Sequence, residues 1–483
     1  MKYKFIALAM VLALILSAAA AASMDGGLLP RTIQHEEAQD DNGVQRAGKL
    51  PVVCIETDGG ILPAVSGKTS TTAETAESAV KVGAEVYVYN GDGTGGYDAS
   101  APLLRHRAVV RYRGHSSLRF DKKQYKINFV GEDGTEDKSV AFLGMEPYDE
   151  WALNAPYLDR SLMHNYLCFN VAGQILPYTP DVRYCEVYVN GSYEGLYLGM
   201  ETIAKGSGRV DIETYKDGDR NIAYLVREDW KATSESALSD LAARGMLYNF
   251  KSNMEVIYPG TDKLNGDNKN RIERDMSRFE KALYSYDYDS FAYGYRQYLD
   301  VDTFVDYYLI NEFTQNVDAG RYSTYFYKDV KGKLCAGPVW DFNSALGYYV
   351  DADLSTGGFV MPTKTFFDML MKDEAFVNRV IARYRQLRKT VLSEAYLLSF
   401  VDDTEVYLGD AITRNNDRWG REMYGSGTQK EILLQPLDRN PENYPQAVDQ
   451  LKTFLIRRGK YLDNYIDSLQ QYCHESAVKK YNP

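Results

Sequence analysis

Two aspartates at the ends of one predicted β-hairpin constrain this chain more than any other feature. Residues 322–328 (YSTYFYK) are rich in aromatic and β-branched side chains, which favour a strand. Residues 329–332 (DVKG) have turn chemistry, and residues 333–340 (KLCAGPVW) run back. Pairing about this turn sets Asp341 opposite a residue only two positions from Asp318, and paired Cα atoms lie about 5 Å apart. The hairpin therefore predicts one site that contains both carboxylates.

Two carboxylates in one site raise each other's pKa when no cation lies nearby. Such pairs are typical of metal sites and of acid–base sites. A second interpretation stays open from the residues alone, because Asp is common in turns and both aspartates can be turn or cap residues. Asp318 and Asp341 are the candidate functional pair.

The start of the chain is typical of an exported protein. Lys2 and Lys4 precede an apolar stretch at residues 5–16, and alanines follow at the expected cleavage position. We interpret residues 1–23 as a signal peptide that ends near residue 22. An uncleaved anchor is the alternative, since the apolar stretch approaches the ~18 residues of a membrane span. Residues 24–49 are polar and lack periodicity, which predicts a disordered leader. We expect an exported or cell-surface protein.

Charge and cysteine usage exclude several kinds of partner. The formal net charge of −12 argues against nucleic acid and against anionic membrane. No second long apolar run follows the first, so we expect no second transmembrane segment. The five cysteines show no C-x-x-C spacing, which excludes a zinc knuckle and gives no disulfide framework. Cys168, Cys185 and Cys335 lie in apolar contexts and are expected to be buried free thiols.

Strand-type and helix-type patterns are segregated along the chain. Short β-type runs fill residues 50–205, interrupted by one helical pattern at 159–173, whereas helical patterns dominate residues 206–418 around the 321–341 hairpin. The expected helices there are residues 234–250, 270–286, 301–316, 366–386 and 393–418. A further helix at 444–472 lies in a C-terminal helical extension, residues 419–483. This order predicts an α+β fold with a β-rich lobe and a helical lobe.

A motif of the phosphate-loop type fails on its context. Residues 91–96 (GDGTGG) match G-x-G-x-x-G after a strand, but no helix follows to supply amides and a dipole for a pyrophosphate. A hairpin loop is the better interpretation of this segment.

The second informative segment, residues 110–129, reads as strand, Gly/Ser turn and strand. Alternation on the returning strand puts four side chains on one face: Lys123, Tyr125, Ile127 and Phe129. A lysine on an inward, apolar face needs an anionic partner, because burial of the lone charge is expensive. Lys122 and Lys126 fall on the other face and are expected to be solvated. The alternative for Lys123 is an edge lysine whose stem lies along apolar surface.

Several motifs, in order between about residues 50 and 418, resemble the CotH family of spore-coat-protein-H-like atypical protein kinases. The motifs are RGHSSLRFDKKQYKINF at 113–129, LNAPYLDRSLMHNYL at 153–167, EVYVNGSYEGLYLGMETI at 186–203 and NVDAGRYSTYFYKDVKGKLCAGPVWDFNSALG at 316–347. The resemblance implies a divergent, two-lobed protein-kinase-like fold. It also implies transfer of the ATP γ-phosphate to Ser or Thr of a partner surface or coat protein, with Mg²⁺ or Mn²⁺.

The resemblance assigns roles to individual residues. Asp318 matches the catalytic base, and Asp341 matches the aspartate that holds the metal. Lys123, with Lys122 as the second candidate, is similar to the lysine that pairs with the ATP phosphates. The turn that covers the nucleotide corresponds to Arg113, Gly114, Ser116 and Ser117. Glu201 falls at an acidic position for which a role near the lysine or the nucleotide is expected.

Two positions depart from the pattern of the family. Ser323 replaces an Asn that many relatives place five residues after the catalytic aspartate, and Asn343 replaces the last Asp of a WDFD motif. Both side chains can still offer a neutral oxygen to a metal, but each is a weaker ligand than the residue it replaces. Two other functions therefore stay open. One is a pseudokinase that serves as a surface-binding or adhesion module, and the other is transfer of AMP on the same fold.

Overall fold

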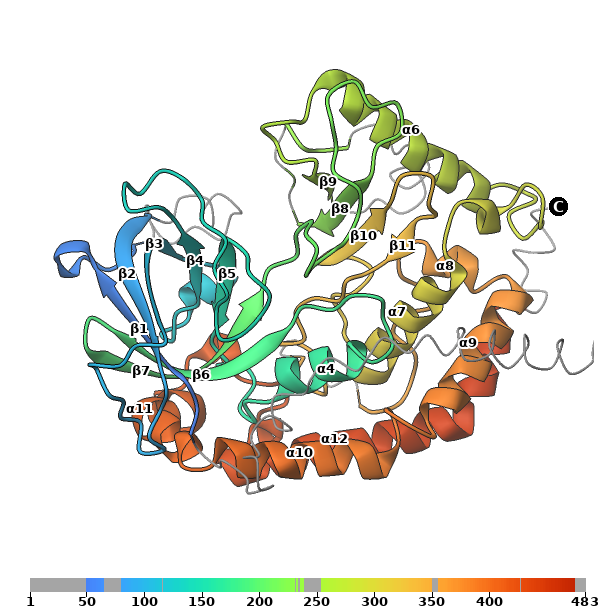
Figure 1. Cartoon of the computed structure of the whole chain (residues 1–483). Coiled ribbons are helices and arrows are strands. Elements are labelled where there is room, and N and C mark those ends of the chain that lie inside the picture. The colour runs from blue at the N-terminus through green and yellow to red at the C-terminus, as the bar shows by residue number, and fades with distance from the viewer. Residues whose placement is uncertain are drawn as a thin grey trace, which may run out of the picture.

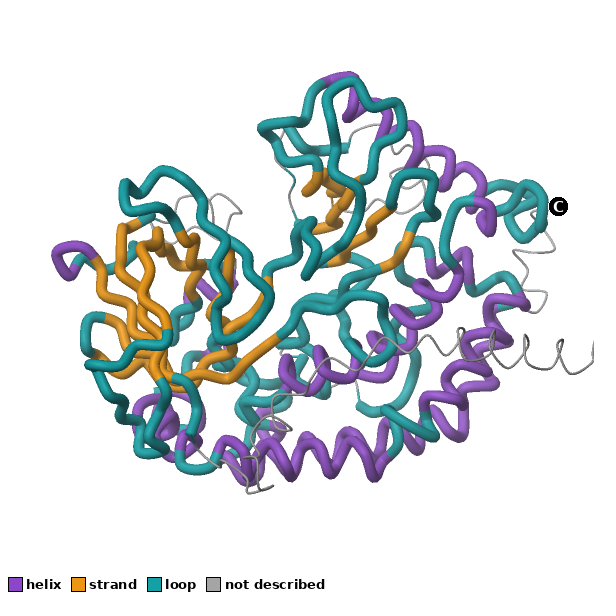
Figure 2. Tube along the Cα trace, viewed as in Figure 1, coloured by secondary structure: helices purple, strands orange, loops and turns teal. Residues whose placement is uncertain are grey.

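The computed structural model describes residues 49–64, 80–114, 116–230, 232, 235–238, 253–349, 355–425 and 427–473. The predicted signal peptide lies outside these residues, as do residues 24–48 of the predicted leader and most of the helix expected at 234–250. Within the described ranges, no helix is both long and apolar enough to cross a membrane. A β-rich N-terminal half precedes a mainly helical C-terminal half, so the α+β prediction is confirmed (Figures 1 and 2).

Seven strands of the N-terminal half close into a barrel, in the order β1-β2-β3-β4-β5-β7-β6. They are β1 (Val52–Thr57), β2 (Val82–Tyr89), β3 (Leu104–Tyr112), β4 (Tyr125–Phe129), β5 (Glu150–Asn154), β6 (Val182–Val189) and β7 (Ser192–Glu201). Asn190 and Gly191 form the turn of the hairpin that joins β6 to β7. β5 was not expected, because EWALN is short and gives little alternation. Tyr125, Ile127 and Phe129 pack in the barrel interior, which closure seals from the rest of the molecule.

A second, four-stranded sheet has the order β11-β10-β8-β9. Its strands are β8 (Tyr224–Asp229), β9 (Asn253–Tyr258), β10 (Thr324–Lys328) and β11 (Cys335–Ala336). β10 and β11 form the predicted hairpin, with Phe326 opposite Ala336, one position from the expected register. β8 and β9 correct the expectation that helices fill the rest of residues 206–418. Their apolar pattern is interrupted by Arg227 and Glu255, which pair with each other across the two strands.

Eight α-helices are present in the described part of the chain. They are α4 (His164–Ala172), α6 (Gly266–Leu283), α7 (Val301–Thr314), α8 (Phe367–Leu370), α9 (Glu374–Leu387), α10 (Glu394–Leu408), α11 (Ala411–Tyr424) and α12 (Tyr444–Tyr465). Short 3₁₀ segments lie at Asp58–Gly60, Ser116–Arg119, Tyr295–Gln297, Lys430–Ile432, Leu437–Arg439 and Ile466–Tyr472. The helix expected at 366–386 is divided at Asp373, whose side chain caps α9. The helix expected at 393–418 is divided at Gly409, and its second part continues to Tyr424.

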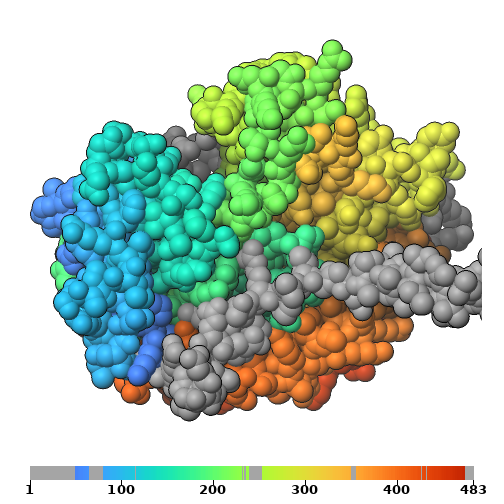
Figure 3. Space-filling model, in the orientation of Figure 1, coloured from blue at the N-terminus to red at the C-terminus, as the bar shows by residue number. Residues whose placement is uncertain are grey.

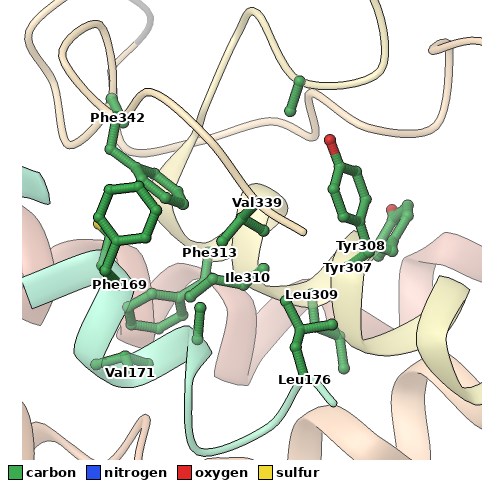
Figure 4. Packing of buried hydrophobic residues seen from close by; sticks show 14 of the residues in the cluster. Phe169, Val171, Leu176, Tyr307, Tyr308, Leu309, Ile310, Phe313, Val339 and Phe342 are labelled. Atoms are coloured by element: carbon green, nitrogen blue, oxygen red, sulfur yellow. The ribbon is translucent and has the colours of Figure 1, made fainter. Parts of the chain in front are cut away.

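Helix α7 lies at the centre of the helical half and is buried along almost its whole length. Its apolar side chains meet Phe169 and Leu176 from the α4 region, and Val339 and Phe342 from the segment after β11 (Figure 4). α10 and α12 run side by side beneath α7 and α4 (Figure 1). Because α7 leads directly into residues 315–318, this packing fixes where Asp318 lies.

Candidate active site

A cavity of about 1610 Å³ lies between the barrel and the four-stranded sheet. In the space-filling view the barrel forms one mass, in blue and teal, and the sheet with its helices adjoins it (Figure 3). Most of the predicted site residues line this cavity: Arg113, Gly114, Ser116, Ser117, Asp318, Ser323, Asp341 and Asn343. The prediction that the hairpin brings Asp318 and Asp341 into one site is thereby confirmed. Lys122, Lys123 and Glu201 are not among the lining residues.

Asp318 is positioned by the end of α7. Gln315 adopts a left-handed conformation that ends the helix, and the carbonyl oxygen of Asp318 accepts hydrogen bonds from Arg321 N (3.1 Å) and Tyr322 N (2.8 Å). Asp318 thus begins a turn and also presents its carboxylate to the cavity. Burial, reinforced by the charge of Asp341, raises the pKa of Asp318 to about 6, while Lys364 opposes the shift. A carboxylate with this pKa suits a general base near neutral pH.

Asp341 is held in a backbone conformation that non-glycine residues rarely adopt, with φ of 55°. Asn316 Nδ2 donates to its carbonyl oxygen (3.2 Å), and Asn343 donates to its Oδ1 from both Nδ2 (2.6 Å) and the backbone N (3.2 Å). Burial raises the pKa of the Asp341 carboxyl. The two hydrogen bonds from Asn343 and the charge of Arg113 oppose this rise. Such strain persists only where the surroundings fix it, as they do at functional sites.

A chain of amide side chains connects this aspartate to the barrel, and the sequence analysis did not predict it. Asn165 of α4 accepts a hydrogen bond from Phe342 N (2.9 Å) and donates to Asn343 Oδ1 (2.9 Å). It also donates to Asn154 Oδ1 (3.2 Å) at the end of β5. Asn343 therefore bridges Asp341 and Asn165, and both ends of its amide are engaged. Asn165 falls within the helical pattern of residues 159–173, but no spacing rule connects it to Asn343.

The lysine of the cavity is Lys126, which corrects the expectation for Lys123. Lys126 lines the cavity and forms an ion pair with Glu150, whereas it was expected to be solvated. Lys123 Nζ donates instead to the carbonyl oxygens of Leu118 (2.8 Å) and Phe120 (2.7 Å). The cause is the closed barrel, because the apolar face of β4 points into the barrel interior and the cavity lies on the opposite face. Lys123 precedes β4 and does not follow its alternation.

Lys122 and Glu201 have structural partners away from the cavity. Lys122 is buried and donates to Leu196 O (2.7 Å) and Asn415 Oδ1 (2.8 Å), so it joins β7 to α11. Burial lowers its pKa to about 7. The Glu201 carboxylate accepts from Tyr178 OH (3.0 Å) and Asp181 N (2.8 Å), which corrects the expectation of a place beside the lysine or the nucleotide.

The turn after β3 brings a cation over the cavity. The Arg113 guanidinium lies over the Trp340 ring, 5.5 Å from its centroid, and donates to Gln124 Oε1 (3.4 Å). Gly114 has φ of +98°, and a Cβ there would lie 1.8 Å from Ser117 Oγ, so the turn requires glycine. Side chains of both signs line the cavity. The cations are Arg111, Arg113, Arg119, Lys126, Arg227 and Arg321, and the carboxylates are Glu150, Asp229, Glu255, Asp318 and Asp341. Lys126 and Arg227 are paired with Glu150 and Glu255. Such a wall suits a ligand that brings anionic groups together with a cation.

Comparison with known proteins shows the family of the chain. The family model described as "CotH kinase protein" matches residues 110–462, well over half of the chain. The chain belongs to the CotH family. It is also similar to the inner spore coat protein H of Bacillus subtilis (strain 168), with 21% identity over 366 residues, which cover 74% of this chain and 87% of that protein. The CotH match begins in β3 and ends in α12, so it includes the hairpin and most of the last helix.

Another carboxylate of this CotH site was not anticipated. Asp229, at the end of β8, lines the cavity, and its charge raises the pKa of both Asp318 and Asp341. Across the residues that the structure describes, no three His, Cys, Asp or Glu side chains gather closely enough to hold a metal by themselves. Mg²⁺ commonly takes one or two carboxylates and completes its shell with substrate phosphates and water. Asp341 can supply one such carboxylate to a metal that arrives with a phosphate ligand.

Proposed function

We propose that this CotH protein binds ATP with Mg²⁺ or Mn²⁺ in the cavity and transfers the γ-phosphate to Ser or Thr of a partner protein. The observation that carries the proposal is the pair Asp318 and Asp341, which reach one cavity from opposite ends of a hairpin; Arg113 and Lys126 line the same cavity. The family match supports a phosphotransferase, and the spore-coat relative supports a partner on a spore coat or cell surface.

Each residue has a defined part in the proposed reaction. The Asp341 carboxylate holds the metal, which neutralises charge on the phosphates when bound. Arg113 and Lys126 add positive charge beside the phosphates, and the Gly114 turn covers them. Asp318 accepts the proton of the acceptor hydroxyl, whose oxygen bonds to the γ-phosphorus as the bond to the β-phosphate oxygen breaks and ADP leaves.

One observation favours the pseudokinase as a second candidate. Asn343 replaces a carboxylate, and its amide is already bonded to Asp341 and Asn165. Such an Asn is a poor second ligand, so a weakened metal site is expected even if transfer occurs. A protein that only binds a partner would keep the fold and lose the metal dependence.

Incubation of the purified chain with γ- or α-labelled ATP, each metal and a Ser/Thr peptide library separates these functions. The proposal predicts that peptides are labelled by γ-labelled ATP and not by α-labelled ATP. This labelling should be abolished in Asp318→Asn and in Asp341→Asn. Label from the α-phosphate would instead identify AMP transfer. No label with either metal would favour the pseudokinase and contradict the proposal.

A further inference from the structure

Helix α12 reaches the loop that carries Asp318 through one buried arginine. Arg458 of α12 and Glu312 of α7 are both fully buried. Arg458 Nη2 donates to Glu312 Oε1 (2.5 Å) and to the Glu312 carbonyl oxygen (2.8 Å). Glu312 lies six residues before Asp318, near the C-terminal end of α7. The last long helix of the chain is therefore bonded directly to the element that positions the base.

The same ion pair holds a second segment, residues 356–361. Arg458 Nη1 donates to the carbonyl oxygens of Thr356 (3.0 Å) and Gly358 (2.8 Å). The Glu312 carboxylate accepts hydrogen bonds from Val360 N (3.0 Å) and Met361 N (2.9 Å). Two of the four hydrogen bonds that Arg458 donates thus go to the backbone of this segment, and both carboxylate oxygens of Glu312 accept from it.

The segment in turn supports the turn that contains Asp318. Lys364 N donates to Met361 O (3.0 Å), and Lys364 Nζ donates to the carbonyl oxygen of Val317. Thr365 N donates to Gly320 O (3.3 Å), and a Cβ on Gly320 would lie 2.6 Å from Lys364 Cβ. The residues on both sides of Asp318 therefore rest on residues 361–365.

We propose that Arg458 is a positioning residue of the phosphoryl-transfer site. Through Glu312 it fixes residues 356–361, so that Lys364 holds the turn at 317–320 with Asp318 directed into the cavity. This inference rests on the proposed function. A buried ion pair is often no more stabilising than a well-packed apolar pair, so its bonds to the loop backbone, rather than stability, are its main contribution here.

A paired substitution separates positioning from stability. Arg458→Met alone leaves the Glu312 charge buried and unpaired, and a large fall in Tm is expected. Arg458→Met with Glu312→Met removes both charges and is expected to recover part of that fall, because the backbone groups of residues 356–361 still lose their partners. We expect kcat of this double variant to drop at least tenfold with KM for ATP changed less than twofold, because Arg113, Lys126 and Asp341 lie on other elements.

The matched control is a second ion pair on the same helix. Asp306 of α7 bonds to Arg383 of α9 (Nε to Oδ1, 2.7 Å), and neither residue contacts residues 355–365 through a hydrogen bond in the described chain. Asp306→Met with Arg383→Met removes an ion pair that is less deeply buried, with 11% and 28% of the two side chains exposed, and should leave kcat within twofold. An equal loss of kcat in the control, or a normal kcat in the Arg458/Glu312 double variant, would overturn the proposal.

Two further measurements keep the proposal testable if a step fails. Should the double variant not fold, Arg458→Lys retains the charge but cannot bond both backbone segments at once, and the same loss of kcat is expected. Should the wild-type chain transfer no phosphate, the proposed function fails, and amide hydrogen exchange still tests the coupling. Exchange at residues 317–321 should accelerate at least tenfold in the Arg458/Glu312 variant and not in the control, and unchanged exchange would refute it.

Discussion

The ionised form of Asp318 should destabilise the folded protein, and Asp318→Asn should relieve that cost. Burial and the Asp341 charge raise the pKa of Asp318 from 3.8 to about 6. A folded-state pKa above the unfolded value means that the native protein binds the proton more tightly. The stability of the wild type therefore falls as pH rises through the window from about 4 to 6. The amide has the same shape and carries no charge, so it escapes this loss.

The magnitude follows from the shift. A difference of about 2 pKa units corresponds to roughly 3 kcal/mol at pH 7.5, where the carboxylate is ionised in both states. Because the Asp318 side chain is only partly buried, solvent screening lowers the expected gain to about 1–3 kcal/mol. At pH 4.5 the native carboxyl is mostly protonated, and about a third of the gain should remain by the same relation.

Urea unfolding of the wild type and Asp318→Asn, at pH 7.5 and pH 4.5 in EDTA, measures both values. The chelator is needed because a bound metal would offset the repulsion. The exposed Asp438, on a 3₁₀ segment outside the cavity, gives the control Asp438→Asn, for which we expect less than 0.5 kcal/mol at either pH. A variant less stable than the wild type at pH 7.5, or an equal gain at both pH values, would refute the reasoning.

Three further predictions follow from the geometry. Lys126→Met should raise KM for ATP at least tenfold in a steady-state transfer assay, whereas Lys123→Met should change it less than threefold, because of these two lysines only Lys126 lines the cavity. A larger effect of Lys123→Met would instead support Lys123 as the lysine that pairs with the ATP phosphates. Asn343→Asp should destabilise the metal-free protein by about 1–3 kcal/mol in urea unfolding, because it replaces a hydrogen-bond donor to Asp341 by a like charge. Millimolar Mn²⁺ should recover this loss of stability, and no recovery would argue against a metal at Asp341. Gly114→Ala should weaken ATP binding measured by calorimetry, because its Cβ would overlap Ser117 Oγ; unchanged affinity would mean that this turn does not cover the nucleotide.

Local patterns were enough to predict the hairpin and most of the helices. Turn chemistry at residues 329–332 gave the register of β10 and β11 to within one position. Helical periodicity located α7, α9 and α10, and a polar cap or a glycine explains each split that was missed. These features depend on neighbours in sequence, which is why they could be read without a structure.

The missed features depend on tertiary contacts. The choice between Lys123 and Lys126 required knowledge that the barrel closes, since closure decides which face of β4 meets the cavity. The Asn165 bridge joins residues far apart in the chain, and no spacing rule connects them. Asp229 lies at the end of β8, which the sequence analysis did not predict. Arg227 interrupts the apolar pattern of this strand, and its partner Glu255 lies on β9, far away in the sequence.

Binding of ATP with a metal in this cavity is the central claim, and isothermal titration calorimetry with a non-hydrolysable ATP analogue tests it most directly. We expect one site per chain that requires Mg²⁺ or Mn²⁺ and is lost in Asp341→Ala, while the control Lys123→Met binds as the wild type does. Absence of binding with either metal, or metal-independent binding that survives Asp341→Ala, would contradict the claim.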